Sequence, residues 1–250
     1  MRVKRQYLNV KEMRAAYQLE TFPRLREPED FALRMSLANK KTMLTMMLHI
    51  DEALPTSLTI LPPELSALSV WMFSHCIRGI ERSIYTRIEV HLKKIVDLGR
   101  VSVHMRDEIF LQILKQLRVN TTVNNVQTPE PGSSDRLWRS LAACLAHFPP
   151  SSLFENYLEM FLRSQVDEAS HDISELGKKL KEGDASVKVS TGVYISTARQ
   201  ESQRGTSVKK DDNKIGVDIR GQILRAKSSR AHARLCVRLM HEAIFIYGYD

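Results

Sequence analysis

The chain has 250 residues, 43% of them hydrophobic, which is enough for one large domain or two small ones with a sizeable core. No run approaches the roughly 18 apolar residues that span a bilayer, and the first residues lack the apolar core of a signal peptide, so we expect a cytoplasmic protein without membrane insertion. A formal net charge of +8 favours an acidic partner, but zinc-finger spacing, RNP-like strand motifs and dense Lys/Arg tracts are absent from the sequence, which disfavours nucleic acid.

Residues 1–29 are predicted to form a basic N-terminal arm with one short amphipathic helix, which Pro23 and Pro28 interrupt. Asp30 can cap a helix that ends at Leu54–Pro55. The methionines of this helix lie among leucines at helical spacing, which favours core packing over a partner-binding surface. We therefore expect the helical domain to begin at residue 30.

Two more helices are predicted before residue 100. Pro62–Pro63 starts one that runs to Gly79 and is apolar around most of its circumference, so it should lie in the middle of a bundle. The other spans 84–98, and Gly99 can end it in a left-handed cap conformation. Cations on and beside this second helix form a first basic face for an acidic partner. They are Arg82, Arg87, Lys93 and Lys94.

The sequence over 102–118 predicts a helix with a wide apolar stripe, so one of its faces is buried. Asp107 and Glu108 fall near its start, where acids complement the helix dipole, and we interpret them as structural. The other side of the helix forms a second basic face, for which the ordinary interpretation is solubility with weak surface ion pairs. This face consists of Arg106, Lys115 and Arg118.

After a polar loop, Ser134 or Asp135 can cap a further helix, which Pro149–Pro150 ends. The spacing of Ser152 and Glu155 indicates a capping box that starts the next helix at once. Three helices thus follow one another, and the last two are joined by a tight corner.

The two helices on either side of the polar loop carry a resemblance to a known family. Their sequence is similar to the signature of the myosin tail homology four domain, the helical module of certain unconventional myosin and kinesin tails. Leu137 stands where that family commonly has glycine. Nine of the motif residues are interpreted as structural, with Trp138 as a core anchor. They are Arg106, Asp107, Glu108, Gln112, Gln116, Trp138, Phe148, Pro149 and Pro150. The motif residues are Arg106, Asp107, Glu108, Ile109, Phe110, Gln112, Lys115, Gln116, Trp138, Cys144, Leu145, Phe148, Pro149, Pro150 and Ser151.

The composition changes after Leu162. Residues 163–229 contain few large apolar side chains and many charges, Ser and Gly, so we expect an insertion with a disordered middle and at most one helix near 172–180. Long structureless segments are uncommon inside compact domains, so this stretch is an insertion, a regulatory tether or a linker.

Helical periodicity returns at residue 229 or 230, and its pattern is similar to the closing helix of the family domain. If this helix completes the core, a single domain extends over 30–247. The alternative is a domain that ends near residue 162 and an independent tail. The matching positions are Ala233, Cys236 and Leu239.

We predict an all-α bundle of about six or more helices that acts as a non-catalytic interaction module. The resemblance implies attachment to the cytoskeleton, through microtubules or through a cargo protein. In the first case the basic faces meet acidic tubulin through salt-sensitive contacts. The alternative is a scaffold that holds a cargo protein or peptide by apolar anchors in a groove between helices. A nucleic-acid binder is a third possibility that rests on net charge alone.

Catalysis has few candidate residues in this sequence. Phosphate-binding loops, nucleophile elbows, HExxH pairs and dinucleotide fingerprints are absent, so we expect no enzyme, cofactor, metal site or small-molecule substrate. Cys144 and His147 could pair as thiol and base, but Cys144 falls on a face that we expect to be buried. With Cys76 and Cys236 it is interpreted as a buried thiol in a reducing compartment.

Overall fold

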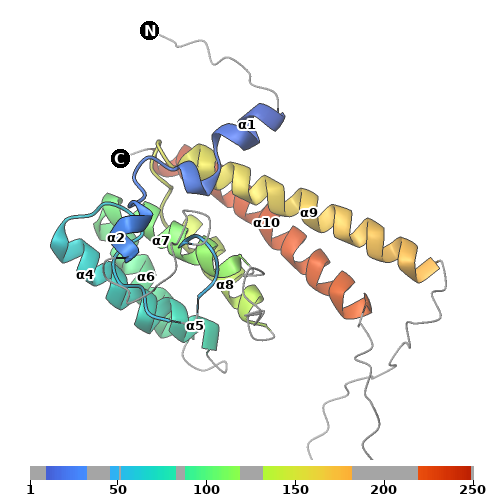
Figure 1. Ribbon diagram of the computed structural model, residues 1–250, viewed down its shortest axis with the longest axis horizontal. Helices are drawn as coiled ribbons and strands as arrows, with labels where there is room; N and C mark the ends of the chain where they lie inside the picture. The colour runs from blue at the N-terminus through green and yellow to red at the C-terminus, as the bar shows by residue number, and fades with distance from the viewer. Residues whose placement is uncertain are drawn as a thin grey trace, which may run out of the picture.

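The computed structural model describes residues 10–32, 46–50, 52–82, 88–118, 132–181 and 219–248. The predicted all-α fold is confirmed, and an isolated antiparallel bridge joins Leu25 to Thr59 (Figure 1). Among the described residues, none of the helices is long and apolar enough to cross a membrane. Most of the helix predicted from Asp30 onward lies outside these residues. The helical elements are α1 (Val10–Ala16), η1 (Leu19–Thr21), α2 (Pro28–Ala32), α4 (Pro63–Met72), η2 (Phe73–Ile77), α5 (Arg78–Arg82), α6 (Ile88–Val101), α7 (Val103–Leu117), α8 (Ser133–Leu145), α9 (Glu155–Lys181) and α10 (Ile219–Tyr247).

Helix α7 forms the centre of the bundle, because every residue from Asp107 to Gln116 is buried. The elements α4, η2, α6 and α8 all contact it. Elements α4, η2 and α5 follow one another without a break, and η2 is a π-helical turn inside this composite helix. Met72, Phe73 and Ile77 are completely buried there, but Trp71 is 39% exposed, so this helix covers the core with one side and is not the central helix that the sequence predicted.

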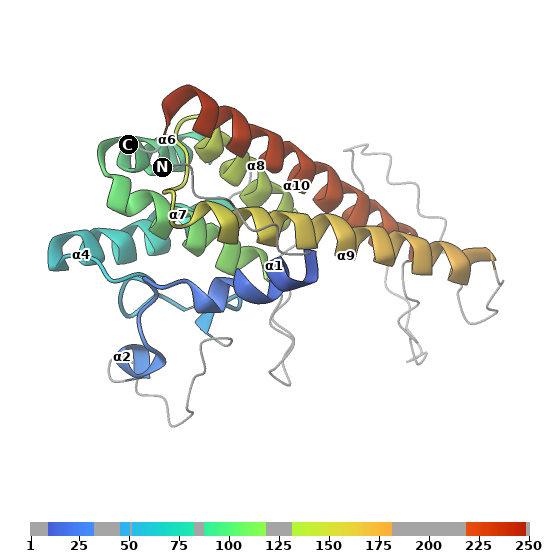
Figure 2. The same cartoon turned by 90° about the horizontal axis from the view of Figure 1, so that it is seen from above.

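Helices α9 and α10 lie side by side and extend together away from the compact part of the fold (Figures 1 and 2). Near the bundle they contribute Leu158, Leu162 and Cys236 to the common core. The helix predicted near 172–180 lies within α9, which runs without a break from Glu155 to Lys181, and α10 begins at Ile219, ten residues before the predicted start at 229, so the predicted insertion is too long at both ends. The remainder of that stretch, 182–218, lies outside the described residues.

The N-terminal arm packs on the domain through apolar side chains. Phe22 is buried and makes edge-to-face contacts with Phe154 and Tyr157, at centroid distances of 4.9 and 5.2 Å. Behind it, the backbone N–H of Arg26 donates to the carbonyl of Leu58 at 2.9 Å. The described part of residues 1–29 is therefore an integral layer of the fold.

Three helix boundaries differ from the prediction, each for its own physical reason. Gly99 lies inside α6, and it allows a close approach rather than a left-handed turn, since a Cβ there would lie 2.3 Å from the Phe148 ring. Helix α8 begins after Gly132, which has φ of 82°, without a side-chain cap. Before α9, the hydroxyl of Ser151 accepts the Phe154 N–H at 3.2 Å, so the cap is Ser151 and not the predicted Ser152.

Candidate protein-interaction site

A buried carboxylate, Glu108 of α7, joins three parts of the fold. Its Oε2 accepts hydrogen bonds from the backbone N–H of Thr59 at 2.7 Å and from the Thr59 hydroxyl at 2.6 Å. Its Oε1 accepts from the N–H of Leu58 at 2.8 Å, the hydroxyl of Ser69 at 2.7 Å and the amide of Gln112 at 2.7 Å. Five donors thus compensate the burial of one charge, and the role of Glu108 is structural.

Asp107 likewise binds a neighbouring element. Its carboxylate accepts the N–H of Ser151 at 3.0 Å and the Ser151 hydroxyl at 2.7 Å, which fixes the corner before α9. Because α7 begins at Val103, neither Asp107 nor Glu108 lies in its first turn, so the predicted interaction with the helix dipole is wrong. Burial raises the pKa of Asp107, against the opposing effect of the hydrogen bonds from Ser151 and of nearby guanidinium groups.

Lys115 does not belong to a basic face, contrary to the prediction, because it is only 1% exposed. Its ammonium group donates to the carbonyl of Met46 at 2.6 Å and also to that of Leu48. The next residue, Gln116, donates to the carbonyl of Ile50 at 2.9 Å. Both side chains therefore fasten residues 46–50 to the central helix.

A second buried carboxylate, Glu81 at the end of the composite helix, has charged and polar partners. It contacts His49 Nε2 at 2.5 Å, the guanidinium of Arg78, and the amide of Gln116 at 3.0 Å. Burial alone would raise the pKa of Glu81, but the hydrogen bond from His49 and the charge of Arg78 lower it below its ordinary value. Glu81 therefore remains ionised inside the protein.

The remaining motif residues also pack in the interior. Trp138 stacks on His232 at a centroid distance of 6.5 Å, which joins α8 to α10. Phe148 lies 5.4 Å from Phe110. The sequence motif therefore marks the packing of the bundle and not its outer surface. The motif residues that are buried between α8 and α9 or within α8 are Trp138, Cys144, Leu145, Phe148, Pro149 and Pro150.

Part of the first predicted basic face is exposed on the structure. Lys93 pairs with Asp97 at 2.6 Å, and their side chains are 77% and 52% exposed. Lys94 is exposed and lies 5.5 Å from the centre of the Trp71 ring. Arg82 is exposed at the end of α5. These three cations are exposed on α5 and α6.

The second predicted basic face is not formed. Arg118 is only partly exposed and makes an ion pair with Glu20, while Lys115 is buried. Arg106 is partly buried, and its Nε–H donates to the carbonyl of Gly99 at 2.9 Å. Arg87, from the first predicted face, lies outside the described residues.

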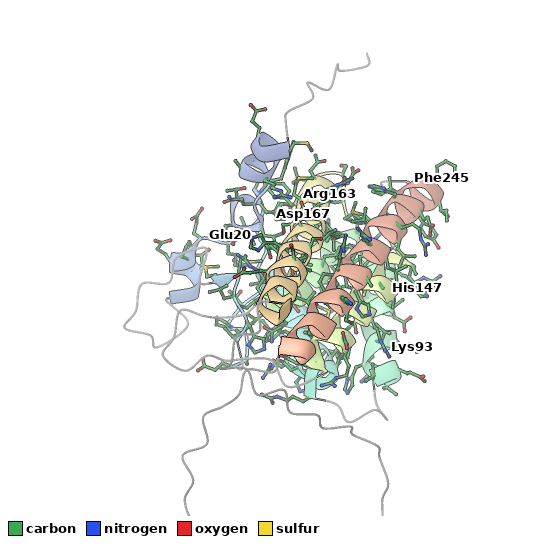
Figure 3. All side chains as sticks on the ribbon, turned by 90° about the vertical axis from the view of Figure 1, so that its right-hand side faces the viewer. Glu20, Lys93, His147, Arg163, Asp167 and Phe245 are labelled. Atoms are coloured by element: carbon green, nitrogen blue, oxygen red, sulfur yellow. The ribbon has the colours of Figure 1, made fainter. Side chains whose placement is uncertain are left out.

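Helix α10 carries a basic stripe that the sequence interpretation missed. It consists of Lys227, Arg234, Arg238 and His241, which are exposed and recur at helical spacing. Glu242 is the one acidic residue in this helix, and it lies 3.5 Å from Arg238. Figure 3 shows Lys93 of α6 and Phe245, near the end of α10, on the same side of the molecule in that view. The repeat of cations in 227–241 was the signal that could have revealed this stripe.

A groove of about 770 Å³ runs between the N-terminal arm, the end of α7 and α9. Its apolar lining includes Leu19, Leu48 and Phe161, and its rim carries Arg118 and Glu168. Its size and mixed lining are those of a site that can hold a peptide or a small side-chain cluster.

Cys144 and His147 do not form a catalytic pair. Burial raises the pKa of the Cys144 thiol far above its ordinary value and that of Cys236 to about 12. His147 is exposed on the surface, and its Nδ1–H donates to the carbonyl of Ala143 at 2.7 Å. The thiol is therefore an apolar core group, as expected from its position in α8.

The described residues form a helical bundle in which buried polar side chains join the elements and exposed cations lie on outer helices. Comparison with known proteins identifies its kind. Residues 92–192 match the family model of the MyTH4 domain. The resemblance of the sequence motifs to the myosin tail homology four domain is thereby confirmed.

The relatives are unconventional myosins. The chain is 28% identical over 225 residues to the high molecular weight form of myosin-1 of Acanthamoeba castellanii, covering 86% of this chain and 14% of that protein. It is 30% identical over 150 residues to human unconventional myosin-XV, covering 56% of this chain and 4% of that protein. The MyTH4-FERM MF1 structure of Dictyostelium discoideum myosin VII has the same fold, with a TM-score of 0.53 and 15% identity, over 96% of this chain and 35% of that one.

Proposed function

We propose that this MyTH4-type module is a non-catalytic adaptor that binds microtubules through the exposed cations of its outer helices. The observation that supports the proposal is the separation of cations into two groups. Lys115 is used up inside the core, whereas Lys93 and Lys94 on α6 and the stripe on α10 face outward. Similarity to unconventional myosins supports a cytoskeletal setting for such a surface.

The ion pairs of these cations do not prevent binding to an acidic surface. Lys93 is paired with Asp97, and Arg238 with Glu242, but each pair is exposed and joins residues four apart on one helix. Exposed pairs of this kind contribute roughly 0 to 1 kcal/mol, so either cation can exchange its own acid for a carboxylate of the partner. The acidic surface of a microtubule offers many such carboxylates.

The test is co-sedimentation of the full chain with microtubules, using three charge reversals of exposed cations. Lys93→Glu and Arg238→Glu place a negative charge on the proposed surfaces. Arg139→Glu is the control, because Arg139 is exposed on α8 and belongs to neither proposed surface. We expect the first two to reduce pelleting at low salt and the control to leave it unchanged.

Equal pelleting of all four proteins would refute the assignment of these surfaces. Charge-led binding should also weaken steeply between 0.1 M and 1 M salt, as the Debye length falls from about 10 Å to about 3 Å.

The groove beside the N-terminal arm supports a second candidate function, in which the module holds a cargo peptide by apolar anchors. This groove presents Leu19 and Phe161 in a concave surface of about 770 Å³. Binding there should change little with salt, because buried apolar contacts and not charges supply the affinity. A salt-insensitive interaction that Tyr17→Ser abolishes without a loss of helix content, with Lys93→Glu unaffected, would favour cargo binding over microtubules, because Tyr17 lines the groove and is only half-buried.

A further inference from the structure

A small hollow lies where the ends of four helices meet. Its volume is about 240 Å³, smaller than the cavities that take drug-sized ligands, so it suits a single side chain or a small anion. Its walls come from α6, α7, the end of α8 and the end of α10. The residues that line it are Arg100, Arg106, His147, Phe148, Pro149 and Tyr247.

The floor of the hollow is rigid. Phe148 and Pro149 are buried, and Gly99 lies so close to the Phe148 ring that a Cβ at this position would approach it to 2.3 Å. Arg106 is held from two sides, because its Nε–H donates to the Gly99 carbonyl at 2.9 Å and its guanidinium lies 6.0 Å from the centre of the Phe148 ring. One end of its fork is thus fixed, which leaves the terminal N–H groups for a ligand.

The lining contains cations and no acid. Arg100 is exposed at the rim, and among the described residues it makes no ion pair. The nearest carboxylate on α7, Asp107, is satisfied by Ser151. His147 also faces the hollow, with its Nδ1–H committed to the carbonyl of Ala143 and its Nε2 left over. Figure 3 shows His147 at the surface, on the same edge as Lys93 and Phe245.

We propose that this hollow is a carboxylate-binding pocket that takes a glutamate or aspartate side chain of an acidic protein partner. Two guanidinium groups from different helices can clamp a planar carboxylate through charge-assisted hydrogen bonds. The hydroxyl of Tyr247 can add another donor, and the ring of Phe148 packs against the aliphatic part of the acidic side chain. The proposal rests on the proposed function, since it states how an acidic partner is held at one point of the surface.

The pocket would also make the proposed binding selective for certain acidic surfaces, whereas the exposed cations attract all of them. Exposed cations on α6 and α10 attract any acidic surface, and salt screens them. A fixed arginine in a concave site requires a carboxylate at a defined position, which is how polar groups confer specificity. Arg100 and Arg106 would therefore determine where along an acidic surface the module settles.

The test uses the full chain and a labelled hexaglutamate peptide, with hexaglutamine as the uncharged control, followed by fluorescence anisotropy. Arg100→Gln is the informative variant, because Arg100 is exposed and its loss does not disturb the core. Arg139→Gln is the matched control, since it removes one exposed arginine that belongs neither to the pocket nor to the proposed basic surfaces. We expect Arg100→Gln to weaken hexaglutamate binding about tenfold, the effect of losing one charge-assisted hydrogen bond, and Arg139→Gln to weaken it less than twofold.

A second variant, Tyr247→Phe, removes only a hydroxyl group and should weaken binding by a smaller factor. Equal losses in Arg100→Gln and Arg139→Gln would overturn the pocket and indicate diffuse attraction. Binding of inorganic phosphate by the chain, measured by calorimetry, together with no binding of hexaglutamate would overturn the assignment to a protein carboxylate. Microtubule pelleting is measured separately. If the chain binds hexaglutamate but does not pellet with microtubules, only the microtubule partner is refuted. If the chain pellets and Arg100→Gln pellets to the same extent, only the pocket is refuted.

Discussion

Replacing Glu108 by Gln tests the central structural conclusion, that this carboxylate holds the segment before α4 onto α7. The side chain keeps its size, so the change acts on hydrogen bonds alone. In the less costly orientation, the new NH₂ group takes the place of Oε2 and faces the backbone N–H of Thr59, which is 2.7 Å away in the native protein. The Thr59 hydroxyl can rotate to accept, but the N–H cannot.

The expected cost follows from this geometry. One buried N–H without a partner costs about 1–3 kcal/mol. The three bonds at Oε1, from Leu58, Ser69 and Gln112, lose their charge assistance, which made them roughly twice as strong as neutral ones. We therefore expect Glu108→Gln to lower the free energy of unfolding by about 2–4 kcal/mol.

The assay is urea-induced unfolding followed by circular dichroism, with Glu89→Gln as the control. Glu89 is exposed in the first turn of α6, and its replacement should change the stability by less than about 0.5 kcal/mol. A shift of the urea midpoint with an unchanged slope would assign the loss to the native state. If Glu108→Gln unfolds within about 0.5 kcal/mol of the native chain, the five-donor arrangement does not hold the fold together.

Three further predictions concern the same interior. Gly99→Ala should destabilise by about 1–3 kcal/mol, because its methyl group meets the buried Phe148 ring at 2.3 Å, and Phe148→Leu should recover part of the loss in thermal unfolding. Lys115→Met should cost about 1–3 kcal/mol in urea unfolding, since the carbonyls that now accept its N–H groups lose their donor inside the protein. The folded-state pKa of Glu81 is lowered, so its contribution to stability is present above the unfolded pKa and is lost as pH falls through the folded pKa. Unfolding measured at pH 7 and pH 4 should therefore show a smaller acid-induced loss of stability in Glu81→Gln than in the native chain, although the variant is less stable at pH 7 because Arg78 loses its buried partner.

The sequence predicted the helices well where apolar spacing alone decides the structure. The helices at 63–82, 103–117 and 133–145 follow from the period of their buried residues, and the first and the last of them also from proline at one end. Boundaries set by tertiary contacts could not be found in this way. Gly99 appeared to be a helix stop, because glycine commonly ends helices, but it lies within α6 where the Phe148 ring from a distant part of the chain approaches it.

Helices α9 and α10 show why composition misled the prediction for 163–229. Few large apolar residues occur there, so a stretch of this kind is expected to lack a core. Two helices that lie against each other need only a narrow seam, and small residues such as Ala169 and Ala233 are buried near it. The apolar content of such a seam is too low to stand out in a window that also contains the charged outer faces.

Among the candidate site residues, Lys115 shows most clearly how sequence reasoning failed. Glu108, Gln112, Lys115 and Gln116 recur at positions i, i+4, i+7 and i+8, so they form a polar stripe that looks like the solvent face of an amphipathic helix. In the structure this stripe is covered by residues 46–50 and 56–59, whose backbone groups it satisfies. Periodicity identifies which residues share a face, but it does not say whether water or irregular backbone covers that face.

The buried polar stripe of α7 belongs to the residues that define the fold, and these differ from the exposed residues that can bind a partner. The side chains of the MyTH4 motif make contacts within the core, since Glu108, Lys115 and Trp138 are all buried. Replacing them in this chain should destabilise the fold and should not redirect binding. We therefore expect the choice of partner to depend on side chains that the core does not use, and the outward cations of α6 and α10 and the rim of the Arg100 pocket are the ones that we propose for this role.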